Sequence, residues 1–497
     1  MTDLDARVAR LNDILSTVNL LSWDSRVTMP AGGAETRGHQ IATLKRIARD
    51  MLLDPAMADA AEAAREAATD PVTRRGAEAV LAARDWHARL PEALLSARDE
   101  ASITARLAWA EAREKGDFAL FRPHLETIVA QAREMAQALG PVDHPYDALL
   151  PIYEPGETAA SLTALFDRLA EGLRPILDTA LGRPQPRTDF LTRGFAVEKQ
   201  QAFCRQIAAE LGYDFTRGRL DTTIHPFEIS FTRQDVRITS RWRPDWLPMA
   251  IFGTIHETGH ALYEQGVDPV HTRGAHATDM IGLYAVGGTS FGMHESQSRL
   301  LENHVGRSRA FWERHFGTLR AQFPEELADV DAETFTAGVN AVRPGFVRVE
   351  ADELTYDVHI LLRVRLELAL LDGSLEVADL PAAWNEAMKR DLGLTVPEDG
   401  VTGCLQDVHW SSGYLGSFPT YTLGNLTAAS IMARLAETDP QVGQGLDQGD
   451  TAPLRAVLAD KVWRHGRSLS RAELLAQMGG DAADPQPYLD YLAAKFG

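Results

Sequence analysis

Hydrophobic residues recur at helical spacing through most of the chain. Between residues 4 and 22 they form one stripe of a helix, made of Leu4, Val8, Leu11, Ile14, Leu15 and Val18. Further helical stretches, rich in Ala, Arg and Glu or opened by a capping residue such as Thr158, are predicted over 37–69, 72–115, 124–139, 157–182 and 195–212. The pattern therefore predicts a mainly α-helical protein.

Two short segments alternate with a period of two instead. Residues 227–231 and 236–240 flank a Thr-Arg-Gln-Asp turn, which predicts a small antiparallel β-hairpin over 227–240. Residues 401–425 are rich in Gly, Ser and aromatic side chains, and we interpret them as a long irregular loop. Long loops inside compact proteins are often functional.

Composition narrows the function classes. The 497 residues carry a formal net charge of −20, and they contain no basic patch long enough to predict nucleic-acid binding. Two cysteines indicate no disulfide scaffold and fit a reducing cytoplasm. Residues 1–5 do not resemble a signal peptide, and the apolar stretch 246–255 is too short to span a bilayer. We therefore expect no membrane partner.

An H-E-x-x-H run at residues 256–260 is the strongest chemical signal. His256 and His260 are four positions apart, so on a helix their rings project from one face and can share a metal ion. Glu257 lies one step round that helix, where it can take a proton from a water molecule that the metal activates. The alternative interpretation is a pair of surface histidines.

A catalytic zinc needs a third protein ligand and one open position. The metzincin spacing fails, because position 266 is Gly266 rather than histidine. Glu295 begins an amphipathic stretch that predicts a second helix, and a helix holds a ligand more firmly than a glycine-rich loop does. We favour Glu295 on this ground, with Gln297 and Arg299 as donors that could orient carboxylates. The alternatives that stay open lie in the loop: His271, His276 and Asp279.

Together with other motifs, these residues resemble the carboxypeptidase Taq (M32) family of zinc metallocarboxypeptidases. The resemblance runs nearly end to end, and its N-terminal part covers residues 21–35. Six ordered motifs carry it: H-P-F at 225–227, D-x-R-x-T at 235–239, H-E-x-x-H at 256–260, H-E-S-Q at 294–297, V-R-x-x-A-D at 347–352 and G-x-x-Q-D-x-H-W at 403–410. One departure is the 35-position spacing from His260 to Glu295 (295 − 260), which exceeds the family pattern and makes the shape of the 267–288 loop an open question.

The resemblance implies a large helical body of the gluzincin type, with a deep active-site groove and a small sheet beside it. It further implies a homodimer, one divalent ion per chain (zinc, with cobalt as the alternative) and peptide substrates cleaved poorly next to proline. We interpret 1–497 as a single metallocarboxypeptidase domain. Its expected parts are a helical region over roughly 1–215, a zinc-site region over roughly 216–430 and a helical region over roughly 431–497.

A carboxypeptidase must bind a free terminal carboxylate, and the forked arginine side chain matches two oxygens. Arg348 and Arg237 are the candidates, because each lies in a family-like motif; each could equally serve a structural ion pair. The 227–240 hairpin could also offer its edge to a peptide backbone, although a purely structural ribbon is an equal alternative.

Other candidates are polar side chains near the motifs. His409 and Tyr421 could each donate a hydrogen bond to the developing oxyanion, with Asp407 holding His409 in one tautomer. His225, which precedes a proline, is a candidate substrate-binding residue. We interpret Glu264, four positions past His260, as a solvated helix glutamate rather than a partner of the site.

The sequence thus predicts a zinc metallocarboxypeptidase in which Glu257 is the general base and His256, His260 and Glu295 hold the metal. Two alternatives remain. One is an aminopeptidase or oligopeptidase with the same zinc core. The other is a non-catalytic zinc- or peptide-binding protein, which the intact Glu257 disfavours.

Overall fold

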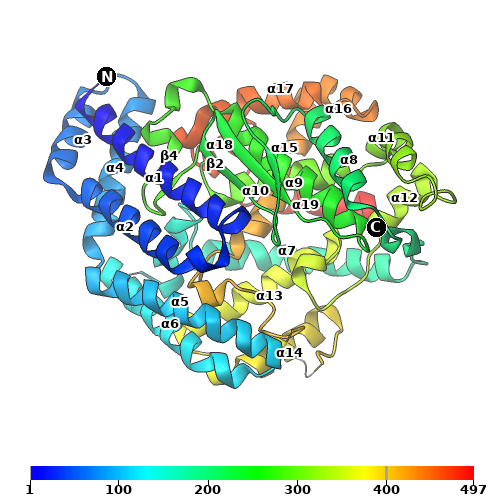
Figure 1. The fold of residues 1–497 in the computed structure, drawn as a ribbon, viewed down its shortest axis with the longest axis horizontal. Coiled ribbons are helices and arrows are strands. Elements are labelled where there is room, and N and C mark those ends of the chain that lie inside the picture. The colour runs from blue at the N-terminus through cyan, green and yellow to red at the C-terminus, as the bar shows by residue number, and fades with distance from the viewer. Residues whose placement is uncertain (1, 141, 398–400) are drawn as a thin grey trace. The chain divides into compact units, whose positions relative to one another are not determined.

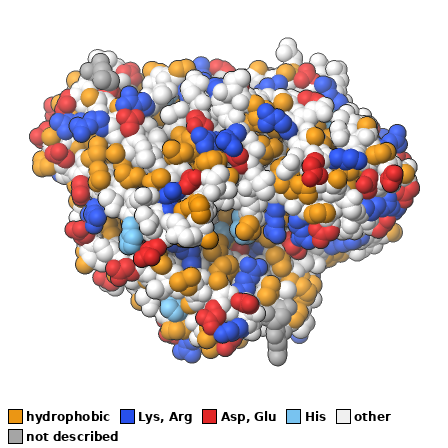
Figure 2. All heavy atoms as spheres, in the orientation of Figure 1, with side chains coloured by type: hydrophobic (Ala, Val, Ile, Leu, Met, Phe, Trp, Pro, Cys, Tyr) orange, Lys and Arg blue, Asp and Glu red, His pale blue; other side chains and the backbone are white. Residues whose placement is uncertain are grey.

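The structure is a computed structural model that describes residues 2–140, 142–397 and 401–497. Across them the chain forms nineteen α-helices and five short strands (Figure 1). The predicted mainly helical fold with a small sheet is confirmed. None of the helices in the described part combines the length and the apolar character needed to cross a membrane. On the face drawn in Figure 2, acidic and basic side chains are interspersed.

The chain divides into two compact units, each assembled from separate stretches of sequence. The first comprises Met1–His87, Pro186–Ala341 and Gly424–Ala482, and the second comprises Ala88–Gln185, Val342–Leu423 and Ala483–Gly497. The metal-binding motifs at 256–260 and 294–297 lie in the first unit, whereas the motifs at 347–352 and 403–410 lie in the second. The single metallocarboxypeptidase domain stays a prediction.

Several helices of the first unit are found where the hydrophobic pattern predicts them. Its N-terminal helix α1 buries Leu4, Val8, Leu11, Leu15 and Val18 as one stripe and lies beside α2 (Figure 1). Helices that begin in this unit are α1 (Asp3–Val27), α2 (Ala34–Leu53), α3 (Pro55–Ala67), α4 (Pro71–Arg89), α8 (Val197–Glu210), α9 (Leu247–Gly266), α10 (Phe291–Arg299), α11 (Arg309–Gln322), α12 (Ala332–Val339), α16 (Pro440–Asp447), α17 (Ala452–Lys461) and α18 (Arg471–Gln477).

The second unit also consists of helices. Thr158 caps α7 as predicted, because its hydroxyl accepts a hydrogen bond from the backbone N–H of Ser161 at 3.0 Å. Helices that begin in this unit are α5 (Glu92–Lys115), α6 (Phe118–Leu139), α7 (Ala159–Leu181), α13 (Glu353–Asp372), α14 (Leu380–Leu392), α15 (Pro419–Thr438) and α19 (Gln486–Phe496).

The predicted hairpin is confirmed and belongs to a three-stranded sheet. Strands β2 (Glu228–Thr232) and β3 (Asp235–Ser240) pair antiparallel, with Glu228 opposite Ile238. A third strand, β1 (Leu220–Thr222), pairs parallel to β3, which the sequence did not predict. Strands β4 (Thr278–Asp279) and β5 (Tyr284–Ala285) form a short hairpin within the long loop.

Helix α9 is the central element of the first unit. It is buried on nearly all sides and packs against β3, α8 and α10. Its contact with α10 depends on Gly259, because a Cβ atom there would lie 2.4 Å from the carbonyl oxygen of Gln297 and 2.5 Å from Cα of Ser298. The two helices therefore touch through their backbones, and this close approach positions their polar side chains.

The predicted loop over 401–425 is only partly correct. Residues 401–418 contain turns and the one-turn helix Trp410–Ser412, but α15 begins at Pro419. Proline suits the first position of a helix because its fixed φ matches the helical value and its missing N–H would be unpaired there. Tyr421 therefore lies in the first turn of a helix rather than in a loop.

Candidate active site

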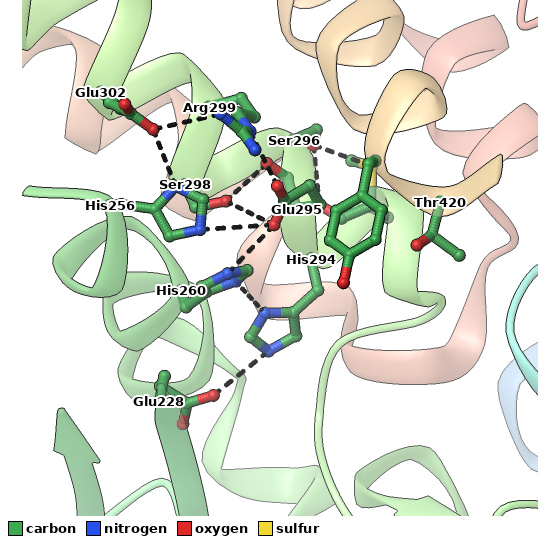
Figure 3. Close-up of polar contacts among 12 residues, drawn as sticks. Glu228, His256, His260, His294, Glu295, Ser296, Ser298, Arg299, Glu302 and Thr420 are labelled. Carbon is green, nitrogen blue, oxygen red and sulfur yellow. Dashed lines mark hydrogen bonds and ion pairs between the residues drawn. The ribbon is translucent and has the colours of Figure 1, made fainter. Parts of the chain in front are cut away.

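Helices α9 and α10 bring His256, His260 and Glu295 together (Figure 3). One carboxylate oxygen, Oε2 of Glu295, lies 3.5 Å from Nε2 of His256 and 3.3 Å from Nε2 of His260. Metal–ligand bonds of about 2.0–2.1 Å in a tetrahedron separate neighbouring ligand atoms by about 3.3–3.4 Å. Both oxygen–nitrogen separations fit a shared ion, and all three ligand atoms lie within 4.8 Å of one another. Among the residues that the structure describes, they are the one group with this metal-binding arrangement.

The alternative third ligands have other partners. His276 Nε2 is 2.9 Å from the carbonyl oxygen of Val72. Asp279 accepts hydrogen bonds from the backbone N–H groups of Ile281 and Gly282 at 3.2 and 3.0 Å. His271 stacks edge-on against His276. These three side chains are outside the group formed with His256 and His260.

A buried carboxylate orients the ring of His256. Nδ1 of His256 lies 2.9 Å from Oε2 of Glu302, and Nη2 of Arg307 donates to Oε1 of the same carboxylate at 3.0 Å. Nε2 of His256 therefore faces Glu295, while Nδ1 contacts Glu302 on the opposite side of the ring. Burial lowers the pKa of His256, but Glu295, Glu302 and Glu257 together raise it to about 10.

Glu295 is held in place by residues of its own helix. Nε of Arg299 donates to Oε1 of Glu295 at 2.7 Å, and the hydroxyl of Ser298 donates to Oε2 at 3.1 Å. Burial acts to raise the pKa of Glu295, but His256 and Arg299 hold it well below its ordinary value. Arg299 thus orients this carboxylate as expected, whereas Gln297 instead accepts a hydrogen bond from the indole of Trp463 at 2.8 Å.

His260 contacts a second chain of polar groups. Its Nδ1 is 2.6 Å from Nδ1 of His294, and Nε2 of His294 is 2.9 Å from Oε1 of Glu264. Glu264 is 3% exposed, and it accepts further hydrogen bonds from the backbone N–H groups of Gly287 and Gly288. The interpretation of Glu264 as a solvated glutamate is therefore wrong.

Glu257 lies on α9 between the two histidines in sequence, but it is not one of the three candidate metal ligands. Its side chain is buried. Burial raises the pKa of this carboxyl to about 7, although the neighbouring His256 opposes the shift. A carboxyl group with this pKa can both accept and release a proton near neutral pH.

In the second unit, Arg348 and Asp407 form a buried ion pair. Nε of Arg348 donates to Oδ1 of Asp407 at 3.0 Å, and Nη1 donates to the hydroxyl of Tyr356 at 3.0 Å. A second buried arginine, Arg363, donates to Oδ2 of Asp407 at 2.6 Å. Two guanidinium groups thus share one carboxylate, and this pairing leaves an excess of positive charge.

His409 belongs to the same region of the second unit. Its Nε2 lies 3.0 Å from the hydroxyl oxygen of Tyr421. Its Nδ1 is 3.8 Å from Oδ1 of Asp407, which is beyond hydrogen-bonding distance, so the prediction that Asp407 holds His409 in one tautomer is wrong. Burial, together with the nearby charge of Arg348, lowers the pKa of His409 to about 3, so its ring is neutral at pH 7. The structure thus brings Arg348, Asp407, His409 and Tyr421 together as one group.

The two remaining candidates lie on and beside the sheet of the first unit. Arg237, on β3, pairs with Asp235 at 2.9 Å, and its guanidinium lies 4.4 Å from the ring centre of Trp23. His225 is exposed in the bend between β1 and β2. Neither belongs to the group around Glu295.

Comparison with known proteins adds to this geometry. Residues 3–496 match the family model described as carboxypeptidase Taq (M32) metallopeptidase. The chain belongs to this family. It is 41% identical over 499 residues to thermostable carboxypeptidase 1 of Thermus thermophilus, an alignment that covers 96% of this chain and 94% of the relative. It is 36% identical over 491 residues to carboxypeptidase 1 of Bacillus subtilis, covering 98% and 96%.

Solved structures give the same result. The M32 carboxypeptidase from Deinococcus radiodurans R1 matches with a TM-score of 0.94 and 38% identity, over 99% of this chain and 98% of that one. The protein is therefore a metallocarboxypeptidase. Membership in an M32 metallopeptidase family implies a divalent metal, and the group of two imidazoles and one carboxylate fits such an ion.

Three residues in these two groups of polar side chains were not assigned a role from the sequence. Glu302 is seven positions past Glu295 (302 − 295), two helical turns along the same face, and this spacing could have suggested its role. His294 was recognised only as part of a motif. Arg363 has no local signal, because its partner Asp407 is 44 positions away.

Proposed function

We propose that this metallocarboxypeptidase is a zinc enzyme that releases single amino acids from peptide C-termini with broad specificity, poorly next to proline. The observation that carries the proposal is the group formed by His256, His260 and Glu295, with Glu257 beside it. Three protein ligands leave one tetrahedral position for water or substrate, which is the pattern of catalytic rather than structural zinc.

The three ligands divide into two kinds. His256 and His260 would bind the ion through Nε2, since their Nδ1 atoms face Glu302 and His294. Glu295 supplies one negative charge, which leaves the site with a net positive charge when the ion is bound. Bound zinc would polarise the scissile carbonyl and acidify a water molecule.

Glu257 is the proposed general base. Its carboxylate takes a proton from the attacking water and delivers that proton to the leaving amine. Its pKa of about 7 supports both halves of this transfer, because the same group must accept and then release a proton within one turnover. The buried position also keeps bulk water from competing for the proton.

Arg348 is the proposed anchor for the terminal carboxylate of the peptide. Its pairing with Asp407 fixes the guanidinium plane, and Arg363 supplies the extra positive charge that favours a second carboxylate. Tyr421 and His409 are proposed to act together on the oxyanion: Nε2 of the neutral His409 donates to the Tyr421 hydroxyl oxygen, which leaves the tyrosine proton free to donate to the oxyanion. Arg237 and His225 are proposed as substrate contacts. The homodimer and the cytoplasmic location stay predictions.

Replacing the proposed base tests this function. Glu257→Gln should retain zinc and lose nearly all turnover of a peptide with a blocked N-terminus and a free C-terminus. Glu66→Gln, an exposed position on α3, is the matched control and should keep full activity. Activity of Glu257→Gln close to that of the control would refute the assignment.

A second arm separates carboxypeptidases from other peptidases. The same blocked peptide with an amidated C-terminus should resist cleavage, because Arg348 then has no carboxylate to bind. Product masses should show loss of one residue at a time. Equal cleavage of the acid and the amide would favour an oligopeptidase instead.

A further inference from the structure

Nδ1 of His260, on the side of the ring away from Glu295, leads into a series of polar groups from three separate elements. His294 belongs to α10, Glu264 to α9, and Gly287 and Gly288 to the end of the long loop that follows α9. They form a continuous path of hydrogen bonds away from the ion site, with successive separations of 2.6 and 2.9 Å up to Glu264. The path ends on backbone N–H groups.

The direction of donation along this path is set at its far end. Glu264 accepts from Gly288 N at 2.8 Å, from Gly287 N at 2.9 Å and from the hydroxyl of Ser230 at 2.9 Å. A carboxylate that is already held by three donors can only accept from His294, so Nε2 of His294 carries the proton.

The tautomers of the two histidines follow from this direction. A His294 ring that carries a single proton, on Nε2, offers a lone pair at Nδ1. Two facing ring nitrogens need one donor and one acceptor, so Nδ1 of His260 must carry the proton. Nε2 of His260 then has its lone pair directed toward Glu295, which is the form that a metal ion binds.

The loop end also fits closely around the His294 ring. A Cβ atom at Gly288 would lie 2.3 Å from Cδ2 of His294, so the loop can approach only because residue 288 is glycine. On another side, the ring of Tyr263 is 5.4 Å from the His294 ring between centres. His294 is thus packed in one orientation as well as hydrogen bonded.

We propose that His294 is a positioning residue for the metal centre, which acts through His260, and that Glu264 and the loop end at Gly287–Gly288 select its tautomer. This inference rests on the proposed zinc function. It assigns a role to the long 267–288 loop: the end of that loop helps to orient the metal ligand His260 through Glu264 and His294. The competing interpretation is that His294 only fills space between α9 and α10.

Zinc affinity separates these interpretations. His294→Phe keeps a ring but removes both hydrogen bonds, and it should weaken zinc binding by about 10- to 100-fold. His294→Asn restores an acceptor where Nδ1 lies and should recover part of that loss. The affinities are measured on the metal-free protein by competition with a chromophoric chelator, so the readout does not depend on turnover.

Two further measurements test the mechanism of the effect. In the zinc-loaded wild-type protein, the ¹⁵N resonances of His294 should show the proton on Nε2 and the lone pair on Nδ1, and the reverse tautomer would overturn the proposed direction of donation. Gly288→Ala should weaken zinc binding by displacing His294. Gly317→Ala is its control and should not, because nothing lies within 4 Å of a Cβ atom at that position.

The outcomes distinguish this inference from the function on which it rests. If the wild-type protein binds no zinc, the proposed zinc centre is wrong. If the wild-type protein binds one zinc per chain but His294→Phe binds it equally well, or His294→Asn is no tighter than His294→Phe, the positioning role is overturned and the zinc centre stands.

Discussion

Replacing Glu302 by glutamine should weaken zinc binding without removing any metal ligand. The Glu302 carboxylate contacts three groups: Oε2 is 2.9 Å from Nδ1 of His256 and accepts from Nη1 of Arg299 at 3.4 Å, and Oε1 accepts from Nη2 of Arg307 at 3.0 Å. In the amide, one of these positions becomes an NH₂ group. It must then face either the guanidinium, which has no acceptor, or His256, where it favours the wrong tautomer for metal binding.

The magnitude follows from the kind of hydrogen bond that is lost. A hydrogen bond to a charged group contributes about 1.5–3 kcal/mol and a neutral one about 0.5–1.5 kcal/mol. The substitution therefore costs about 1.4 kcal/mol in the orientation of His256, which corresponds to a tenfold higher Kd for zinc. Glu302→Ala leaves Arg307 without its carboxylate partner. It should raise the Kd for zinc by up to about a hundredfold, the upper end for residues that hydrogen bond to metal ligands.

The assay is equilibrium competition between the metal-free protein and a chromophoric zinc chelator at several pH values and fixed ionic strength, and the compared Kd is the value corrected for the proton that zinc displaces from His256. Glu66→Gln should match the wild type, since its side chain is exposed. At saturating zinc, KM for a peptide should stay unchanged. A Kd for Glu302→Gln within twofold of the wild type would refute the claim that this carboxylate orients His256.

Three other predictions concern pH, packing and the thiols. The pKa of His256 is raised to about 10, so below that pH zinc must displace a proton from its ring. The apparent Kd for zinc should therefore fall about tenfold for each unit by which the pH rises between 6 and 8, and a Kd that does not change with pH would contradict this. Gly259→Ala should lower the unfolding free energy by about 1–3 kcal/mol through overpacking between α9 and α10, whereas Gly317→Ala should not lower it, as urea unfolding would show. Burial raises the pKa of Cys204 and of Cys404 to about 12, so neither thiol should react with a disulfide reagent at pH 8 before denaturation.

The features that could be predicted from the sequence are those set by local spacing. The stripe of α1 and the cap at Thr158 follow from helical periodicity and capping chemistry, and both are present. The meeting of His256 with His260 follows from four-residue spacing on one helix. The proximity of Glu295 rested on preferring a helix over a loop, and the structure has this residue on α10.

The remaining features depend on contacts that are distant in sequence. Glu264 resembles a surface residue locally, but the loop end at Gly287 and Gly288 folds back over it. The parallel pairing of β1 with β3 likewise depends on contacts distant in sequence, and the three residues of β1 are too few to predict it. Tyr421 was placed in a loop because the Gly- and Ser-rich run hides the helix start at Pro419.

The most direct test is diffraction from zinc-loaded crystals at the zinc absorption edge. The expected result is one anomalous peak per chain, about 2.0–2.2 Å from Nε2 of His256, Nε2 of His260 and a carboxylate oxygen of Glu295, with one position left for solvent. A peak elsewhere, or an ion whose fourth position is filled by a protein side chain, would contradict the catalytic metal centre.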